Sequence, residues 1–362
     1  MAISPARIAA FQILKRVETD HGYASDLIGR ATQLDSRDAG LTSQIVYGCL
    51  RYMAQLDFLA LKYASRRALK LDVAVSIALR MGIFQIRNLD RIPVHAAVSE
   101  SVELVKWAGK RSAAGLVNAI LRKVNREPVE WPDRGKALSC PEWLLARWTK
   151  EFGDEAARKI ALAALEEPKT YFRGDRVQDI GSQSVVPWLE LKDGEAFLDI
   201  CAAPGNKTAQ ALETPLRLAV AGDLHMHRLQ GLHSLNCPLV QLDAEKPLPF
   251  RPSSVDKILI DVPCSGTGTL GRNPEIKWRL VPDDLEALAT TQRAILRNAL
   301  AVLKPGGRAA YSTCSLEPQE NKAVVERVLA LLPDYEVVST DQRLPGRDEG
   351  DGFYTAVIVR KT

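Results

Sequence analysis

Apolar residues recur at helical spacing through the first third of the chain. Five segments show this pattern, at residues 6–17, 43–64, 72–86, 94–109 and 113–127. Apolar positions three or four residues apart lie on one face of an α-helix, and a helix buries that face against its neighbours. Pro93 interrupts the pattern, and Pro128, Pro132 and Gly135 end it. The pattern therefore predicts an all-helical domain whose connector begins after residue 127.

The pattern changes after Pro168, where short runs rich in Val, Ile and Leu follow a further helical segment at 141–168. The runs lie at 196–202, 216–223, 239–244, 256–264 and 308–315, with two more strand candidates at 335–339 and 354–361. Helices or loops separate them, including a helical pattern at 285–303. Strands that are apolar on both faces and alternate with helices are typical of a parallel sheet with helices on both sides. We therefore predict an α/β domain here.

The composition is that of a globular protein, with 362 residues, 46% of them hydrophobic and 25% charged, and this length suggests two domains. No apolar run approaches the roughly 18 residues of a membrane span, and the N-terminal segment lacks the apolar core of a signal peptide. We therefore expect a cytosolic protein. Residues 1–130 carry 19 Lys and Arg against 12 Asp and Glu, which suggests a polyanionic partner. The pairs Arg66-Arg67 and Lys110-Arg111 could contact phosphates, although isolated pairs usually just solvate a helix.

The six cysteines are widely spaced, at positions 49, 140, 201, 237, 264 and 314. They include no CxxC pair, which argues against a zinc ribbon and, in a chain without an export signal, against a disulfide framework. His225, His227 and His233 are close in sequence but match no common zinc-ligand spacing, so a solvated helix face is the better interpretation. We expect no metal. The thiols are then either buried small side chains or chemically active groups.

The first predicted strand ends in a turn that suits a ligand. In an open α/β sheet, ligands bind beyond the carboxyl ends of the strands. Here the strand ends at Asp199, and small residues with Gly205 lead into a helix. Such a turn lets the backbone approach a ligand closely, and the N–H groups at the helix start are free to bind it. Asn206 tolerates a positive φ, so a left-handed turn there would also fit. Taken alone, the segment could equally be an ordinary strand-to-helix turn.

Carboxylates end the next two predicted strands, at Asp223 and Asp243. In nucleoside-binding Rossmann proteins, a carboxylate at the end of the second strand holds the ribose diol. Asp243 could accept hydrogen bonds from an adenine amino group. Each aspartate alone could simply cap the following helix. Three consecutive strand ends with suitable residues favour an adenosine cofactor.

Two thiols and a carboxylate follow the fourth and fifth predicted strands. Asp261 and Cys264 follow one strand and Cys314 the other, so a parallel sheet would bring them to one edge. One cysteine at a strand end is usually a buried small residue, but two in polar turns fit thiols presented to a substrate. A thiolate that adds to carbon 6 of a pyrimidine makes carbon 5 nucleophilic enough to take a methyl group, and a nearby carboxylic acid can stabilise the adduct at ring nitrogen 3. The base must be out of its stack, and the chemistry alone leaves open which thiol attacks.

Three motifs resemble those of the RNA cytosine-5 methyltransferases that use S-adenosyl-L-methionine: LDICAAPGNKT (198–208), DKILIDVPCSGTGTLGRNPEIKW (256–278) and YSTCSLEPQEN (311–321). The segment 79–127 resembles the NusB-like RNA-binding domain. This pairing is characteristic of the RsmB (Sun/Fmu) family of bacterial small-subunit rRNA cytosine-5 methyltransferases. The resemblance implies a Rossmann-like class I methyltransferase fold, with a mostly parallel seven-stranded sheet and an antiparallel final strand. It also implies three regions: a NusB-like domain at 1–127, a linker with a reduced RNA-contacting subdomain at 128–176, and a catalytic domain at 177–362.

The same resemblance assigns roles to the strand-end residues. Cys314 is the expected nucleophile, Cys264 assists release of the product, and Asp261 orients the target cytosine, with Lys207 beside it. The expected cofactor is S-adenosyl-L-methionine. The positions expected to bind it are Cys201, Ala202, Ala203, Pro204, Gly205, Asn206, Lys207, Asp223, Asp243 and Asp261. The expected partner is RNA, in particular small-subunit rRNA, and we expect the enzyme to act as a cytoplasmic monomer.

Two departures from the family pattern support an alternative. The family usually has GGKT where this chain has Asn206 in the second position, and its members carry several dozen more residues before the VQD segment at 177–179. The alternative is a non-catalytic RNA-binding or ribosome-assembly factor with a vestigial cofactor pocket, although both cysteines and Asp261 are retained. A second enzymatic alternative, methylation of a base amino group, usually relies on an Asn/Asp-Pro-Pro-aromatic motif. Residues 261–264 lack the aromatic side chain of that motif.

Overall fold

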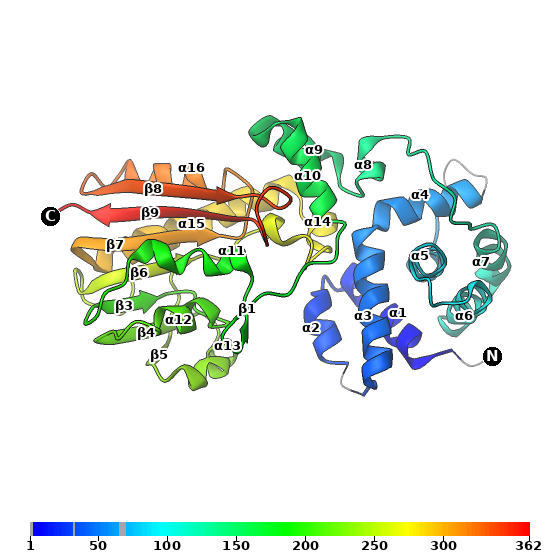
Figure 1. The fold of residues 1–362 in the computed structure, drawn as a ribbon, viewed down its shortest axis with the longest axis horizontal. Coiled ribbons are helices and arrows are strands. Elements are labelled where there is room, and N and C mark those ends of the chain that lie inside the picture. Colours follow the sequence, from blue (N-terminus) through cyan, green and yellow to red (C-terminus); the bar gives the residue numbers. More distant parts are fainter. Residues whose placement is uncertain (1–2, 32, 65–69) are drawn as a thin grey trace. The chain divides into compact units, whose positions relative to one another are not determined.

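The computed structural model describes residues 3–31, 33–64 and 70–362. Arg66 and Arg67, two of the possible phosphate contacts, lie outside the described residues. The chain divides into two compact units, and Figure 1 labels their elements. The helical unit consists of Met1–Lys150, Ala164–Glu166 and Gly271–Arg279, and the sheet unit consists of Glu151–Ala163, Glu167–Leu270 and Leu280–Thr362.

The helical unit confirms the prediction of an all-α N-terminal region. Its helices are α1 (Pro5–Thr19), α2 (Ala24–Gly29), α3 (Ser36–Arg51), α4 (Met53–Tyr63), α5 (Val73–Asn88), α6 (Val94–Trp107), the 3₁₀ turn η1 (Arg111–Ala113), α7 (Ala114–Leu121), α8 (Arg134–Ala137), most of α9 (Glu142–Phe152) and α14 (Ile276–Arg279). Side-chain caps begin three of them, because Asp35 accepts from the Asp38 N–H, Asp72 from the Ala74 N–H and Asp133 from the Lys136 N–H. The segment predicted as one helix over 43–64 is two helices, which meet at Tyr52 (φ −102°, ψ 17°).

The apolar faces of these helices form one core. Helix α5 contributes the most to it, since eleven of its sixteen residues are buried. The helices pack closely enough that small residues are required at some positions. A Cβ atom at Gly48 would lie 1.9 Å from the Phe84 ring, so α3 and α5 approach each other over this glycine.

The sheet unit contains a seven-stranded sheet in the order β5-β4-β3-β6-β7-β9-β8 (Figure 1). The strands are β3 (Ala196–Asp199), β4 (Leu218–Asp223), β5 (Leu239–Gln241), β6 (Val255–Asp261), β7 (Leu303–Thr313), β8 (Tyr335–Arg343) and β9 (Phe353–Arg360). Strands β3 to β7 pair in parallel, and β9 lies antiparallel between β7 and β8. The predicted Rossmann-like methyltransferase fold with its inserted final strand is therefore confirmed.

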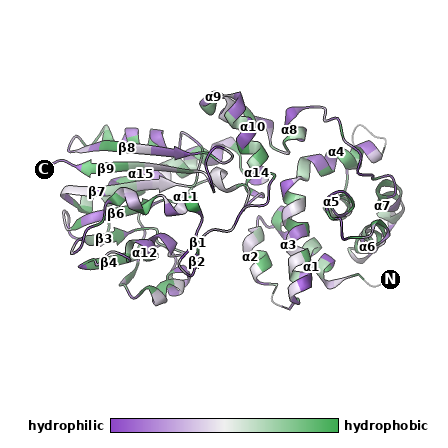
Figure 2. Ribbon diagram, viewed as in Figure 1, coloured by the Kyte–Doolittle hydropathy of each residue, from purple (hydrophilic) through white to green (hydrophobic). Residues whose placement is uncertain are grey.

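Both faces of this sheet are covered, as the apolar strands predict. Figure 2 shows the hydrophobic residues along β3 and β9. On β3, Leu198 belongs to the core cluster that also contains residues of α15 and α16, whereas its neighbour Phe197 belongs to a cluster on the opposite face. The helices of this unit are α10 (Asp154–Ala163), α11 (Ile180–Gln183), η2 (Val186–Leu189), α12 (Asn206–Ala211), α13 (Met226–Leu229), η3 (Gln230–Leu235), η4 (Thr267–Thr269), α15 (Pro282–Val302) and α16 (Lys322–Leu329).

The region between the predicted domains contains short elements. The helical segment predicted at 141–168 is divided into α9 and α10 at Gly153, where φ is +87°. A two-stranded hairpin, β1 (Phe172–Arg173) and β2 (Arg176–Val177), precedes α11. Within the described ranges of the chain, no helix has the length and apolar character needed to cross a membrane.

Candidate active site

Parallel strands place their carboxyl ends at one edge of the sheet, and the predicted site residues lie there. Asp261 is the last residue of β6, and Cys264 follows three residues later. Cys314 directly follows β7, and Lys207 lies in the first turn of α12, which follows β3. The register of β6 with β7 pairs Asp261 with Ser312, so the two turns that carry the cysteines leave the sheet side by side.

Lys207 and Asp261 form an ion pair at this edge. The Lys207 Nζ lies 2.7 Å from Asp261 Oδ2 and 4.9 Å from the centre of the Phe353 ring. The Ser312 hydroxyl donates to the other carboxylate oxygen at 2.5 Å. Burial by itself would lower the pKa of Lys207, but the negative charge and hydrogen bond of Asp261 outweigh it and raise that pKa above its ordinary value. The ammonium group therefore stays charged and holds the carboxylate in place.

The two cysteines are in direct contact. Their Sγ atoms are 3.1 Å apart and both thiols are free. The hydrogen bond to Cys314, followed by burial, raises the pKa of Cys264 well above its ordinary value. Cys264 consequently keeps its proton, and either thiol can be the donor in the contact between the two sulfur atoms. The two thiols are thus placed side by side at the edge of the sheet.

A buried aspartate organises the loop after β3. Asp199 is 1% exposed, and it accepts hydrogen bonds from the Thr208 hydroxyl at 2.7 Å and from the Cys201 N–H at 3.3 Å. Burial raises the pKa of Asp199 to about 7. Burial, together with the negative charge of Asp199, also raises the pKa of Cys201, so this third thiol near the edge is not activated.

The left-handed residue of this loop is Gly205 and not Asn206, which corrects one expectation. Gly205 has φ +100°, and a Cβ atom there would lie 2.9 Å from the Leu232 side chain. Both the backbone conformation and the lack of space therefore require glycine at this position. Asn206 is the first residue of α12, and its side-chain amide donates to the Val177 carbonyl at 2.9 Å. Its role in this structure is thus to fasten the hairpin β1–β2 to the start of the helix.

The other predicted cofactor residues line the same edge farther along the sheet. Asp223 is 3% exposed, and it accepts from the Ala203 N–H at 3.3 Å and from the His225 N–H at 3.0 Å. Arg228 lies 3.6 Å from this carboxylate and donates to the Ala203 carbonyl. Ala202 is buried, Cys201 and Ala203 are half-buried, and Pro204 is exposed.

Asp243 follows β5 and belongs to a separate small cluster. Its carboxylate accepts from the Glu245 N–H at 3.1 Å and forms an ion pair with Lys246 at 3.0 Å, which lowers the pKa of Asp243.

The ring centres of His225 and His227 are 5.5 Å apart. Among the described residues, no group of three or more His, Cys, Asp or Glu side chains is placed to hold a metal ion.

Several side chains at or beside this edge of the sheet were missed by the sequence analysis. Asp199 had a signal, since it is a charged residue that ends an otherwise apolar strand. Ser312 and Glu320 had none, because a serine within a strand and a glutamate in a turn are both common and point to no particular role. Glu320 is nevertheless fully buried, and it accepts a hydrogen bond from the Ser265 N–H at 2.8 Å, beside Cys264.

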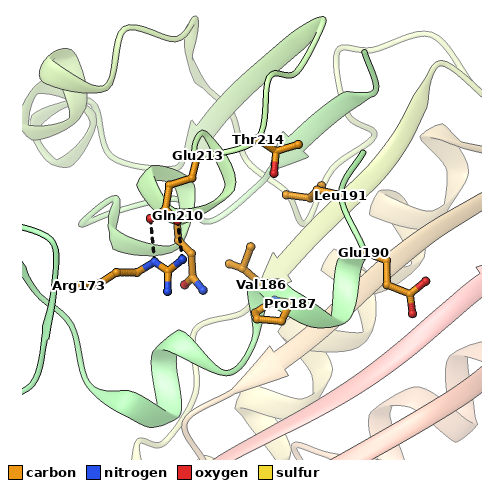
Figure 3. Close-up of a pocket in the computed structure, with 8 residues that line it drawn as sticks. All are labelled: Arg173, Val186, Pro187, Glu190, Leu191, Gln210, Glu213 and Thr214. Carbon is orange, nitrogen blue, oxygen red and sulfur yellow. Dashed lines mark hydrogen bonds and ion pairs between the residues drawn. The ribbon is translucent and has the colours of Figure 1, made fainter. Parts of the chain in front are cut away.

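A cavity of about 440 Å³ lies elsewhere in the sheet unit (Figure 3). Its lining consists of Arg173, Val186, Pro187, Glu190, Leu191, Gln210, Glu213 and Thr214. None of the predicted site residues lines it. Arg173 and Glu213 form an ion pair in its lining, and Gln210 donates to the Gln183 carbonyl, so these polar side chains already have partners within the protein. We assign no ligand to this cavity.

Comparisons with known proteins agree with the two-unit architecture. Residues 186–359 match the family model described as 16S rRNA methyltransferase RsmB/F, and residues 4–126 match that of the NusB family. The chain is 31% identical to the probable ribosomal RNA small subunit methyltransferase B of Bacillus subtilis (strain 168), over 95% of this chain and 93% of that protein. It is also 31% identical to the ribosomal RNA small subunit methyltransferase B of Vibrio vulnificus (strain YJ016), over 98% and 99% of the two chains.

The alignment with the Bacillus protein spans 415 positions, more than the 362 residues of this chain, so that relative contains residues without a counterpart here.

Among solved structures, the crystal structure of PH0851 superimposes with a TM-score of 0.78 at 20% identity, over 99% of this chain and 100% of the other. At that level of identity, the likeness concerns the fold.

Proposed function

This chain belongs to the RsmB/F family of 16S rRNA methyltransferases, and from its site we propose that it makes 5-methylcytosine in small-subunit rRNA through a covalent adduct on Cys314. The observation that carries this proposal is the contact of two free thiols, 3.1 Å apart, at the sheet edge that also holds the Lys207–Asp261 pair. Methylation at carbon 5 needs a nucleophile, a group to orient the base and a group to help release the product. Cys314, Asp261 and Cys264 fit these three needs.

The strand-end loop suits S-adenosyl-L-methionine. Gly205 and the small residues before it let the backbone approach a ligand closely, while carboxylates at Asp223 and Asp243 match the hydroxyl and amino groups of an adenosine. When bound, the cofactor supplies an electrophilic methyl group. In this proposal, the loop 201–205 with Asp223 and Asp243 holds the nucleoside, and Arg228 must move aside where it covers Asp223.

The reaction begins at Cys314. Its thiolate forms a bond to carbon 6 of a cytosine, and the electron pair of the 5,6 double bond moves toward carbon 5. Nitrogen 3 becomes more basic as the sulfur adds to carbon 6, and it takes up the proton that the Cys314 thiol has lost. The Asp261 carboxylate accepts a hydrogen bond from this N–H and so orients the base, and Lys207 holds Asp261 in position. Carbon 5 is then the nucleophile that takes the methyl group.

Cys264 acts in the release step. The proton on carbon 5 must leave so that the double bond re-forms and the bond between carbon 6 and sulfur breaks. The hydrogen bond to Cys314 is the largest cause of the raised pKa of Cys264, and it weakens once Cys314 carries the base. Cys264 is thereby freed to take part in proton removal only after the adduct exists. We expect Cys264→Ala to leave protein covalently attached to RNA.

The experiment is methylation of small-subunit rRNA with labelled S-adenosyl-L-methionine, followed by analysis of the product nucleosides. The proposal predicts 5-methylcytidine from the wild type and none from Cys314→Ala. Cys49→Ala is the control, because Cys49 is a free thiol in the core of the helical unit and its removal should leave turnover unchanged. A different methylated nucleoside, or normal turnover by Cys314→Ala, would show that the assignment is wrong.

A further inference from the structure

Glu320 is a buried carboxylate directly behind the two cysteine turns. Its side chain is 0% exposed. One oxygen accepts from the Ser265 N–H at 2.8 Å and from the Gln292 amide at 2.9 Å. The other oxygen accepts from the hydroxyls of Ser265 and Ser315, each at 2.5 Å. In the described part of the chain, no lysine or arginine is paired with this carboxylate, so these four hydrogen bonds are what compensates its burial.

The partners of Glu320 are neighbours of the catalytic thiols in sequence. Ser265 directly follows Cys264, and Ser315 directly follows Cys314. The two serine hydroxyls are 3.0 Å apart, and the two Sγ atoms are 3.1 Å apart. The carboxylate therefore joins two turns that come from different strands and lie 50 residues apart in the chain.

The Glu320 backbone is itself held to the sheet. The hydroxyl of Tyr311, a fully buried residue of β7, donates to the Glu320 carbonyl. The next residue, Asn321, accepts from the Thr313 hydroxyl and donates to the Ser315 carbonyl at 2.9 Å. These contacts fix the carboxylate relative to β7 and leave it little freedom to follow either turn separately.

We propose that Glu320 is a positioning residue that sets the distance between the Cys264 and Cys314 thiols by joining their turns. The functional part of this inference rests on the function proposed above, because the distance matters when Cys264 acts on an adduct carried by Cys314. Burying a carboxylate without a cation costs stability, and burial raises the pKa of Glu320. The fold retains this carboxylate where its acceptor oxygens can hold three donors from two turns.

The test compares Glu320→Ala, which removes the link, with Glu320→Gln, which keeps its shape and one acceptor oxygen. Ser265→Ala and Ser315→Ala each remove one hydroxyl that donates to Glu320. These two variants replace Glu320→Ala in the test if that variant fails to fold. Ser101→Ala, which removes a buried hydroxyl from α6, is the matched control. Two quantities are measured: the turnover of methylation, and the rate at which diamide oxidises Cys264 and Cys314 to a disulfide, mapped by peptide mass spectrometry.

We expect Glu320→Ala to slow both disulfide closure and turnover about tenfold or more, with the KM for RNA and the affinity for S-adenosyl-L-methionine unchanged. Glu320→Gln should recover most of each rate. Ser265→Ala should cause little additional loss in the Glu320→Ala background, because the two side chains act through one link. Wild-type rates in folded Glu320→Ala, or in the two serine variants, would overturn the inference.

The diamide measurement needs neither RNA nor cofactor, so it separates the two proposals. An inactive wild type whose disulfide closure still depends on Glu320 would refute the proposed function and support the positioning role. A wild type that makes 5-methylcytidine in a Cys314-dependent way, with no effect of Glu320 on either rate, would support the proposed function and refute the positioning role.

Discussion

Two buried lysines, one in each unit of the molecule, have pKa values shifted in opposite directions. Lys207, at the edge of the sheet, faces the carboxylate of Asp261 at 2.7 Å, and its pKa lies above the ordinary value. Lys277, in the helical unit, is 1% exposed and donates to the Arg51 carbonyl at 2.9 Å. Burial lowers the pKa of Lys277 to about 7, and within the described residues no carboxylate is paired with it.

The difference lies in what each lysine is bound to. A carboxylate opposite the ammonium stabilises the charged form, whereas a backbone carbonyl leaves the desolvation penalty uncompensated. Lys277 and Trp278 donate to the carbonyls of Arg51 and Leu50, which lie in the last turn of α3. The Lys207–Asp261 pair at the sheet edge is thus suited to chemistry. Lys277 of α14 is suited to binding the carboxyl-terminal turn of α3.

The largest expected effect is that of Lys207→Met. The substitution leaves Asp261 without its cation, which should cost about 3 kcal/mol of stability and lower methylation about 100-fold or more. Urea unfolding and single-turnover methylation measure the two effects. The matched control is Lys304→Met, which breaks an ion pair of the same length, 2.7 Å, with Asp256 at the opposite ends of β6 and β7. If Lys304→Met lowers methylation as much as Lys207→Met does, then methylation does not depend specifically on the charge of Lys207.

Lys277→Met should change the pH dependence of stability and leave methylation unaltered. Between the folded pKa of about 7 and the ordinary value of 10.5, the unfolded chain binds a proton that the folded chain lacks. The free energy of unfolding contributed by Lys277 therefore rises with pH through this window and is constant below it. Urea unfolding at pH 7 and pH 9.5, followed by tryptophan fluorescence, should show a larger increase for the wild type than for Lys277→Met.

Lys62→Met, at an exposed lysine of α4, is the control for the loss of a positive charge. It should retain the pH dependence of the wild type. An equal pH dependence in wild type and Lys277→Met would contradict the neutral, carbonyl-bound state of Lys277.

The smallest expected effect is that of Asn206→Gly, which restores the sequence usual in the family. Loss of the hydrogen bond to the Val177 carbonyl should cost about 1 kcal/mol of stability. Affinity for S-adenosyl-L-methionine, measured by calorimetry, should change less than about threefold, which is under 1 kcal/mol. A tenfold gain in affinity would instead mark Asn206 as a functional departure from its relatives.

The sequence predicted the fold and the convergence of Cys264, Cys314 and Asp261 because parallel strands bring their carboxyl ends to one edge. It could not place Gly205 rather than Asn206 in the left-handed conformation, since both residues tolerate it. The contacts of Lys277 and Glu320 had no local signal at all. Lys277 binds a residue 226 positions away, and Glu320 joins turns 50 residues apart, so only the folded chain reveals them.

The most direct test of the central claim is covalent trapping on RNA that contains 5-fluorocytosine, in the presence of S-adenosyl-L-methionine. Fluorine on carbon 5 cannot leave as a proton does, so a thiol adduct persists on a denaturing gel and can be mapped to a peptide. We predict an adduct on the peptide containing Cys314, present in the wild type and in Cys264→Ala and absent in Cys314→Ala. An adduct on Cys264, or none on small-subunit rRNA that the protein demonstrably binds, would contradict the account.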